Sequence, residues 1–129
     1  MKKRVLILGS TGSIGTSALI VARQIPDRME IVGLAAGTRV EDLEEQAQEF
    51  GVNHLCLADE SRWGELKGAG RTVFTGAGGL VEIVEATKPD LVLVAIVGVE
   101  GLRPTLKAIE LGCDVAVASK EILVMAGEV

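Results

Sequence analysis

Residues 9–15 read Gly-Ser-Thr-Gly-Ser-Ile-Gly, with a glycine at every third position. This stretch follows the uninterrupted apolar run 5–8, which is typical of a strand that is covered on both faces of a sheet. After the glycines, apolar residues recur at helical spacing as far as Pro26, at Ile14, Ala18, Val21, Ala22 and Ile25. A strand, a glycine-rich turn and a helix therefore open the chain, as they do in a parallel α/β sheet.

The rest of the chain repeats this alternation of strand and helix. Further strands are predicted by the apolar runs at 30–36, 55–58, 91–97 and 115–118. Helices are predicted between these runs by three sets of spaced apolar residues: Val40, Leu43, Ala47 and Phe50; Leu80, Ile83 and Val84; and Leu102, Leu106 and Ile109. We expect Pro89 to end the second of these helices and Gly112 the third.

Residues 59–79 show the weakest periodicity, and for them we expect a variable helix, a strand and a loop. The whole pattern predicts one doubly wound α/β domain over residues 1–129, with a mostly parallel sheet and helices on both faces. This is the Rossmann-like arrangement. A chain of 129 residues with 48% hydrophobic residues has enough apolar material to form the core of such a domain.

Composition narrows the choice of partners. The net charge of -5 and the 2% of aromatic residues argue against a nucleic-acid partner, because such proteins need basic patches and stacking aromatics. The apolar run 91–99 is too short to span a membrane, so we expect no membrane partner and a cytoplasmic location. Cys56 and Cys113 are too few for a disulfide framework and read as buried thiols.

The glycine-rich stretch is the first candidate site. Between a strand and a helix, such glycines let the backbone turn tightly and approach a pyrophosphate, whose charge faces the positive end of the helix. Ser10, Thr11 and Ser13 add hydroxyl groups, which could instead serve only as helix caps. The position of the motif in the strand-turn-helix unit favours dinucleotide binding.

The end of the second predicted strand distinguishes NADPH from NADH. An NAD site commonly has Asp or Glu there to bind the ribose hydroxyls, whereas this chain has Ala36-Gly37-Thr38-Arg39. Arg39 could pair with the 2′-phosphate of NADPH. The sequence therefore favours NADPH, although an arginine at the start of a helix could simply be exposed.

The carboxyl ends of the later strands hold further candidates. Gly98 and Gly101 follow the run 91–97, and Lys120 follows the last strand, where its ammonium group could meet a substrate phosphate or carboxylate. We identify no catalytic constellation: His54 is better interpreted as a partly buried or surface imidazole, neither cysteine has a visible base partner, and no set of His, Cys and Asp has metal-ligand spacing. The sequence thus predicts a binding domain without catalytic or metal residues of its own.

In combination, these motifs resemble a specific enzyme family. They are Gly9-Ser-Thr-Gly-Ser-Ile-Gly15, Ala36-Gly37, Ala95-Ile-Val-Gly98, Gly101-Leu-Arg-Pro-Thr-Leu106 and Ala118-Ser-Lys-Glu121 with Leu123, Val124 and Gly127. In this order they resemble the N-terminal part of the 1-deoxy-D-xylulose-5-phosphate reductoisomerases. The resemblance implies an NADPH-dependent enzyme of non-mevalonate isoprenoid biosynthesis, which converts 1-deoxy-D-xylulose 5-phosphate to 2-C-methyl-D-erythritol 4-phosphate with Mg²⁺ or Mn²⁺.

The resemblance also implies roles for individual residues. The cofactor phosphates would meet Thr11, Gly12, Ser13 and Ile14, and the adenosine phosphate would meet Gly37, Thr38 and Arg39. Ser119 and Glu121 would contact the cofactor, and Lys120 the substrate. The family usually has Asn at the position of Ser119, so this contact is one where the chain departs from the pattern.

The family's metal-binding carboxylates and most of its substrate contacts follow the region that resembles this chain. We therefore expect the chain to be a fragment that binds NADPH without turning over the sugar phosphate, while the intact enzyme forms a homodimer. Two alternatives remain at this point: the nucleotide-binding domain of another NAD(P)-dependent dehydrogenase, and a stand-alone dinucleotide-binding module with no catalytic role.

Overall fold

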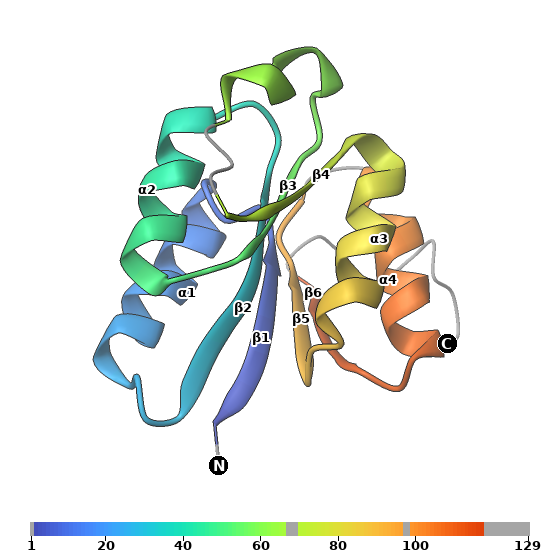
Figure 1. The fold of residues 1–129 in the computed structure, drawn as a ribbon. Helices are drawn as coiled ribbons and strands as arrows, with labels where there is room; N and C mark the ends of the chain where they lie inside the picture. Colours follow the sequence, from blue (N-terminus) through green and yellow to red (C-terminus); the bar gives the residue numbers. More distant parts are fainter. Residues whose placement is uncertain (1, 67–69, 97–98, 118–129) are drawn as a thin grey trace.

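The computed structural model describes residues 2–66, 70–96 and 99–117, which form a sheet with helices on both faces (Figure 1). The strands are β1 (Lys3–Leu8), β2 (Met29–Ala36), β3 (His54–Leu57), β4 (Thr72–Thr75), β5 (Leu91–Val94) and β6 (Asp114–Val117). The helices are α1 (Ser13–Gln24), α2 (Val40–Phe50), α3 (Gly76–Thr87) and α4 (Leu102–Glu110), with the short 3-10 helices η1 (Glu60–Glu65) and η2 (Val99–Gly101).

The strands lie in the order β4-β3-β2-β1-β5-β6, and every neighbouring pair is parallel. The chain therefore runs outward from β1 to β4 and then crosses back to place β5 on the other side of β1. In doubly wound sheets ligands bind at the carboxyl ends of the strands where the order reverses, which here is between β1 and β5. The doubly wound α/β prediction is confirmed.

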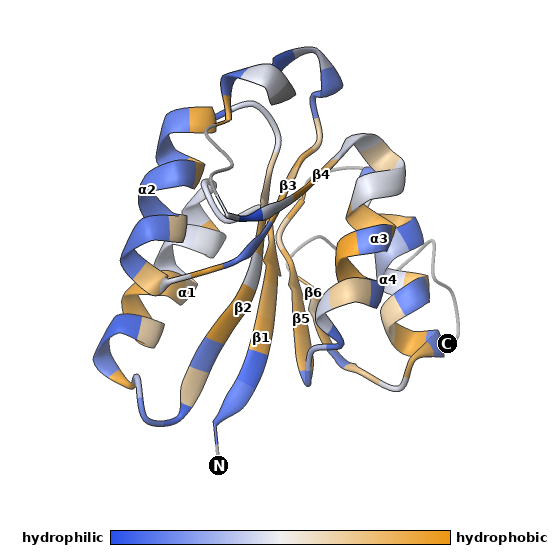
Figure 2. Ribbon diagram, in the orientation of Figure 1, coloured by the Kyte–Doolittle hydropathy of each residue, from blue (hydrophilic) through white to orange (hydrophobic). Residues whose placement is uncertain are grey.

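The core has two layers because β1 is buried on both faces. Val5 and Ile7 belong to a cluster that includes the inner faces of α1 and α2, whereas Leu6 and Leu8 belong to a cluster with α3 and α4. Figure 2 shows the hydrophobic residues gathered along the central strands. This continuous apolar strand, predicted from the run 5–8, is what allows helices to cover both faces.

The predicted apolar face of α1 is correct only in part: Ala22 is buried and Ala18 packs against the core, but the three larger residues do not. Ile14, Val21 and Ile25 are 47%, 50% and 36% exposed, while the buried residues of this helix are Gly15, Leu19 and Ala22. Gly15 lies against the turn after β1, and this close approach sets the rotation of the helix. The face that carries Gly15 therefore points to the sheet instead of the face with the larger side chains.

The stripe predicted for α4 is also wrong. Leu106 and Ile109 are 44% and 39% exposed, and the helix buries Pro104, Thr105 and Ala108 instead. Small residues on the inner side let α4 pack closely, and Thr105 satisfies its buried hydroxyl by donating to the carbonyl of Gly101 at 2.6 Å.

The boundaries also need correction in the middle of the chain. Residues 76–79 form the first turn of α3, where a loop was predicted, and Gly79 packs so tightly that an added Cβ would lie 3.1 Å from Cys56 Sγ. Strand β5 ends at Val94, earlier than the predicted limit. Ala118, predicted as the end of the last strand, lies outside the described residues. Every helix in the described ranges is too short or too polar to cross a lipid bilayer.

Candidate dinucleotide-binding site

The turn between β1 and α1 needs glycine at its first position. Gly9 has a φ of +97°, a conformation that residues with a side chain rarely adopt. A Cβ at Gly9 would also lie 2.6 Å from the carbonyl oxygen of Ala95 on the neighbouring chain segment. The turn can therefore pass beside the segment that follows β5 only because residue 9 lacks a side chain.

Gly15 is required for a different reason, which is the packing of α1 against the same turn. A Cβ at this helical position would overlap the carbonyl oxygen of Gly9 and lie 2.7 Å from the Cα of Ser10. Both ends of the glycine motif are thus explained by contacts within the protein.

Gly12 is not explained in this way. It adopts an extended conformation, with φ -79° and ψ 176°, that any residue can adopt. An added Cβ would have one neighbour, the carbonyl oxygen of Gly9 at an ordinary contact distance of 3.7 Å. The fold leaves room for a side chain at Gly12, and its absence leaves the surface beside the helix open to a ligand.

The N-terminus of α1 is open as well. Gly12 is its N-cap, no side chain caps the helix, and no acidic residue stands in its first turn. The capping role considered for the hydroxyls of Thr11 and Ser13 is therefore not observed. The first N–H groups of a helix carry a partial positive charge, so this end suits an anionic group.

The loop after β2 faces the same space. An open cavity of about 670 Å³ is lined by residues of both segments: Thr11, Gly12, Ser13, Thr16, Gly37, Thr38 and Arg39. The structure thus brings together six of the sequence-predicted cofactor residues from two loops. Ile14 is the exception in the described part of the chain, because its side chain is 47% exposed and does not line the cavity.

A second cavity of about 340 Å³ adjoins the first through Gly37 and Thr38. It is lined also by Ala58, Asp59, Ala77, Leu80 and Glu100. Its walls are mostly small or apolar side chains, with carboxylates at two positions. Hydrogen bonds from the Ser61 hydroxyl (2.6 Å) and backbone N–H (3.0 Å) lower the pKa of Asp59, so this carboxylate is ionised at neutral pH.

Arg39 lies just beyond the end of β2, at the N-cap of α2. No carboxylate stands at Gly37 or Thr38, and the Arg39 guanidinium is 67% exposed, with a long contact of 3.6 Å to Asp42. A contact of this length in solvent holds the side chain weakly. Arg39 can therefore turn toward an anion in the cavity.

Several predicted residues cannot be placed. Gly98, Ser119, Lys120 and Glu121 lie outside the described residues, while Gly101 is buried at the start of α4. Among the described residues, no group of three or more His, Cys, Asp or Glu side chains could hold a metal ion.

Comparison with known proteins gives the family. Residues 5–127 match the family model described as 1-deoxy-D-xylulose 5-phosphate reductoisomerase. The chain belongs to this family. The reductoisomerase of Phocaeicola vulgatus is 47% identical over 132 residues, covering 99% of this chain and 35% of the relative. That of Mycobacterium marinum is 50% identical over 125 residues, covering 96% and 30%.

Solved reductoisomerase structures share the fold. The Zymomonas mobilis enzyme in complex with NADPH has a TM-score of 0.90 and 37% identity, covering 98% of this chain and 34% of that one. A reductoisomerase in complex with NADPH, fosmidomycin and magnesium also has a TM-score of 0.90 and 37% identity, covering 97% and 32%. This reductoisomerase chain spans about a third of the length of the relatives it matches.

The family match removes one alternative, the nucleotide-binding domain of a different dehydrogenase family. Sequence reasoning also missed residues around the site. Thr16 lines the first cavity one helical turn after Gly12, and a hydroxyl four residues from a predicted contact was a usable signal. Gln46 and Arg62 reach the two loops from elsewhere in the chain, and nothing in the local sequence indicated this.

Proposed function

We propose that this chain binds NADPH, with the diphosphate on the glycine-rich turn and the open end of α1. The observation that carries the proposal is the contrast among the three glycines. The fold requires Gly9 and Gly15, whereas Gly12 has room for a side chain and borders the cavity instead. A glycine at a position where the fold would accept a side chain lets a ligand approach the backbone closely, as a pyrophosphate site requires. The Zymomonas mobilis relative, solved with NADPH, supports this assignment.

The 2′-phosphate is assigned to the loop after β2. Gly37, Thr38 and Arg39 offer a flexible backbone, a hydroxyl and a guanidinium at the edge of the same cavity. A guanidinium binds a phosphate through charge-assisted hydrogen bonds. NADH has no 2′-phosphate to accept them. The adjoining cavity beside Ala58 and Leu80 is apolar enough to receive the adenine ring. The remaining cofactor contacts are assigned to Thr11, Ser13, the backbone N–H of Ile14 in the first turn of α1, Ser119 and Glu121.

For the whole protein, we propose the activity of the family. It rearranges and reduces 1-deoxy-D-xylulose 5-phosphate to 2-C-methyl-D-erythritol 4-phosphate, as a cytoplasmic homodimer, with Lys120 contacting the sugar phosphate. NADPH, when bound, supplies the two electrons of the reduction. The Mg²⁺ or Mn²⁺ site is assigned to the part of the family's length that follows the region matched by this chain, as the family resemblance implies.

The binding proposal is tested by titrating NADPH and NADH separately into the chain in a calorimeter. We expect NADPH to bind at least about tenfold more tightly, since hydrogen bonds to a charged group contribute about 1.5–3 kcal/mol. Equal affinities would remove the role of Arg39, and no binding of either would end the proposal. With the sugar phosphate, NADPH and Mn²⁺ together, we expect no oxidation of NADPH by this chain alone. Turnover would show that a catalytic apparatus lies within it.

A further inference from the structure

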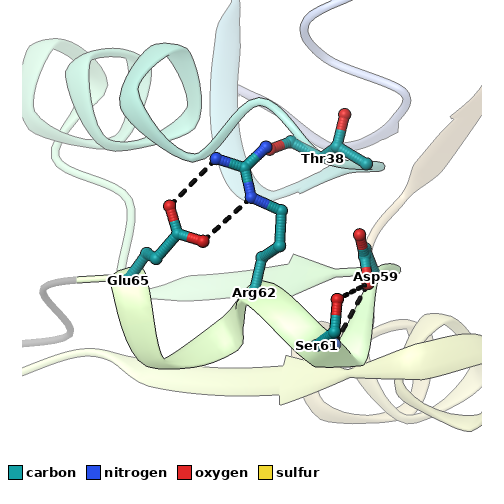
Figure 3. Close-up of polar contacts among 5 residues, drawn as sticks. All are labelled: Thr38, Asp59, Ser61, Arg62 and Glu65. Carbon is teal, nitrogen blue, oxygen red and sulfur yellow. Dashed lines mark hydrogen bonds and ion pairs between the residues drawn. The ribbon is translucent and has the colours of Figure 1, made fainter.

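Arg62 connects two segments at the edge of the proposed cofactor site. It lies in η1, after β3, and its Nη1 donates a hydrogen bond of 2.9 Å to the backbone carbonyl of Thr38 (Figure 3). Thr38 borders both cavities, and the same carbonyl accepts the backbone N–H of Val40 at 2.9 Å. The guanidinium of Arg62 is therefore fixed beside the loop that carries Thr38 and Arg39.

The remaining contacts of this guanidinium leave donors available. Nε and Nη2 each donate to the carboxylate of Glu65 at 2.9 Å, in a two-pronged pair that Figure 3 shows on one edge of the group. A guanidinium has five N–H groups. Two of them donate to Glu65 and one donates to Thr38. The other two have no partner in the described ranges, and the Arg62 side chain is 43% exposed. Arg62 itself lines neither cavity, so these N–H groups would meet a ligand group that projects from the cavities past Thr38.

The guanidinium of Arg62 is a cation among carboxylates: Glu65 pairs with it, and the charges of Asp59 and Glu41 also raise its pKa. Arg39 is a second cation, in the loop after β2, and its acidic partner Asp42 is 3.6 Å away. Glu65 offsets part of the charge of Arg62 while holding its plane in place. Arg39 follows Thr38 in the chain, and Arg62 donates to the Thr38 carbonyl. Two guanidinium groups that reach one phosphate bind it through several N–H groups at once.

We propose that Arg62 is a second specificity-determining residue, which binds the 2′-phosphate of NADPH together with Arg39. This inference rests on the proposed function. In this arrangement Glu65 limits the preference for NADPH, because its carboxylate competes with the phosphate for the same guanidinium. The Arg62–Thr38 hydrogen bond sets where the guanidinium stands, and the two unpartnered N–H groups provide the contact.

Two substitutions with opposite expected effects test this. The measured quantity is the ratio of the NADH to the NADPH dissociation constant, obtained by titration of each cofactor into the full chain. Arg62→Leu is expected to lower the ratio about tenfold or more, because NADPH alone loses a charge-assisted contact. Glu65→Gln is expected to raise it about threefold by releasing the guanidinium. Arg28→Leu is the matched control, since it removes an exposed cation at the other end of the sheet and should leave the ratio unchanged.

Each other result counts against the inference. An unchanged ratio in Arg62→Leu overturns it, and so does an equal loss of both cofactors, which indicates only a structural clamp on η1. If circular dichroism shows that Arg62→Leu is unfolded, Arg62→Lys decides. This variant keeps the charge but loses the planar fork, and its ratio should fall about threefold; an unchanged ratio again rejects the role. Failure of the unsubstituted chain to bind either cofactor rejects the proposed function itself and the inference with it.

Discussion

The side-chain amide of Gln46 donates a hydrogen bond of 3.0 Å to the backbone carbonyl of Ser10, and so ties α2 to the glycine-rich turn. Ser10 is fully buried, and its own N–H donates to the carbonyl of Ala35 at 2.9 Å. The turn is therefore held by β2 on one side and by α2 on the other. Within the described part of the chain, Gln46 Oε1 and Ser10 Oγ are buried without a partner.

We predict that Gln46→Met destabilises the chain by about 1 kcal/mol, because the buried carbonyl of Ser10 loses its side-chain donor while removal of the unpartnered Gln46 Oε1 offsets part of this loss. Urea unfolding followed by circular dichroism measures this difference. The control is Gln48→Met, two residues along the same helix and exposed, which should change stability by less than about 0.5 kcal/mol. Similar losses in both variants would show that the hydrogen bond contributes nothing beyond the properties of the helix.

The buried thiol of Cys56 is expected to make the free energy of unfolding depend on pH. Burial, and secondarily the charge of Glu82, raise the pKa of this thiol from its usual 9.0 to about 12. Between these values the unfolded thiol has lost its proton and the folded thiol has kept it. The stabilisation is therefore complete below pH 9 and is lost as pH rises toward 12, by up to about 1.4 kcal/mol per pH unit.

The comparison with Cys56→Ala isolates this effect, because other groups titrate equally in both proteins. Stability is measured by urea unfolding at several pH values between 7 and about 10.5. The variant is expected to be less stable at pH 7, since Cys56 is fully buried, but to lose less stability at higher pH. Parallel losses in the two proteins would contradict the raised pKa.

The positions of the strands along the chain could be predicted from the sequence more accurately than the buried faces of the helices. The run 5–8 is apolar without interruption, so its burial on both sides followed directly. Hydrophobic spacing identified Ala18 and Ala22 on the inner side of α1 but also selected Val21 there and Leu106 in α4, which are exposed. There the inner face is set by close backbone approach at Gly15 and by the small residue Ala108, and spacing rules give greater weight to large side chains than to small ones.

The candidate site divides in the same manner. Residues 11–13 and 37–39 could be predicted, because each loop directly follows a predicted strand and parallel strands end at one edge. Gln46 and Arg62 could not, since each acts through a single hydrogen bond to a backbone carbonyl more than 20 residues away in sequence. Such contacts depend on how α2 and η1 pack against the rest of the domain, and local sequence patterns do not indicate this packing.

Arg39→Asp tests the assignment of the 2′-phosphate directly. We predict that NADPH binds about 10- to 100-fold more weakly, because a charge-assisted contact is replaced by repulsion, while NADH affinity changes little. The measurement is the dissociation constant of each cofactor at constant ionic strength. Arg28→Asp changes the net charge equally, at the opposite end of the sheet, and should leave both constants unchanged. Unaltered NADPH affinity in Arg39→Asp would place the 2′-phosphate elsewhere.

The three glycines of the turn should separate stability from binding. Gly15→Ala forces a Cβ against the Gly9 carbonyl and should cost about 1–3 kcal/mol or more of folding free energy. Gly12→Ala meets no such contact and should cost no more than about 1 kcal/mol, the difference between two residues at an N-cap.

We predict the reverse order for NADPH. Gly12→Ala should fold and yet bind NADPH at least about tenfold more weakly, since its methyl group occupies the space beside the helix end where the diphosphate would lie. Thermal unfolding and calorimetric titration of the same preparations measure the two quantities. If Gly12→Ala bound NADPH as tightly as the unsubstituted chain, the free space at Gly12 would have no role in the site, and the diphosphate would have to lie against another part of the sheet edge.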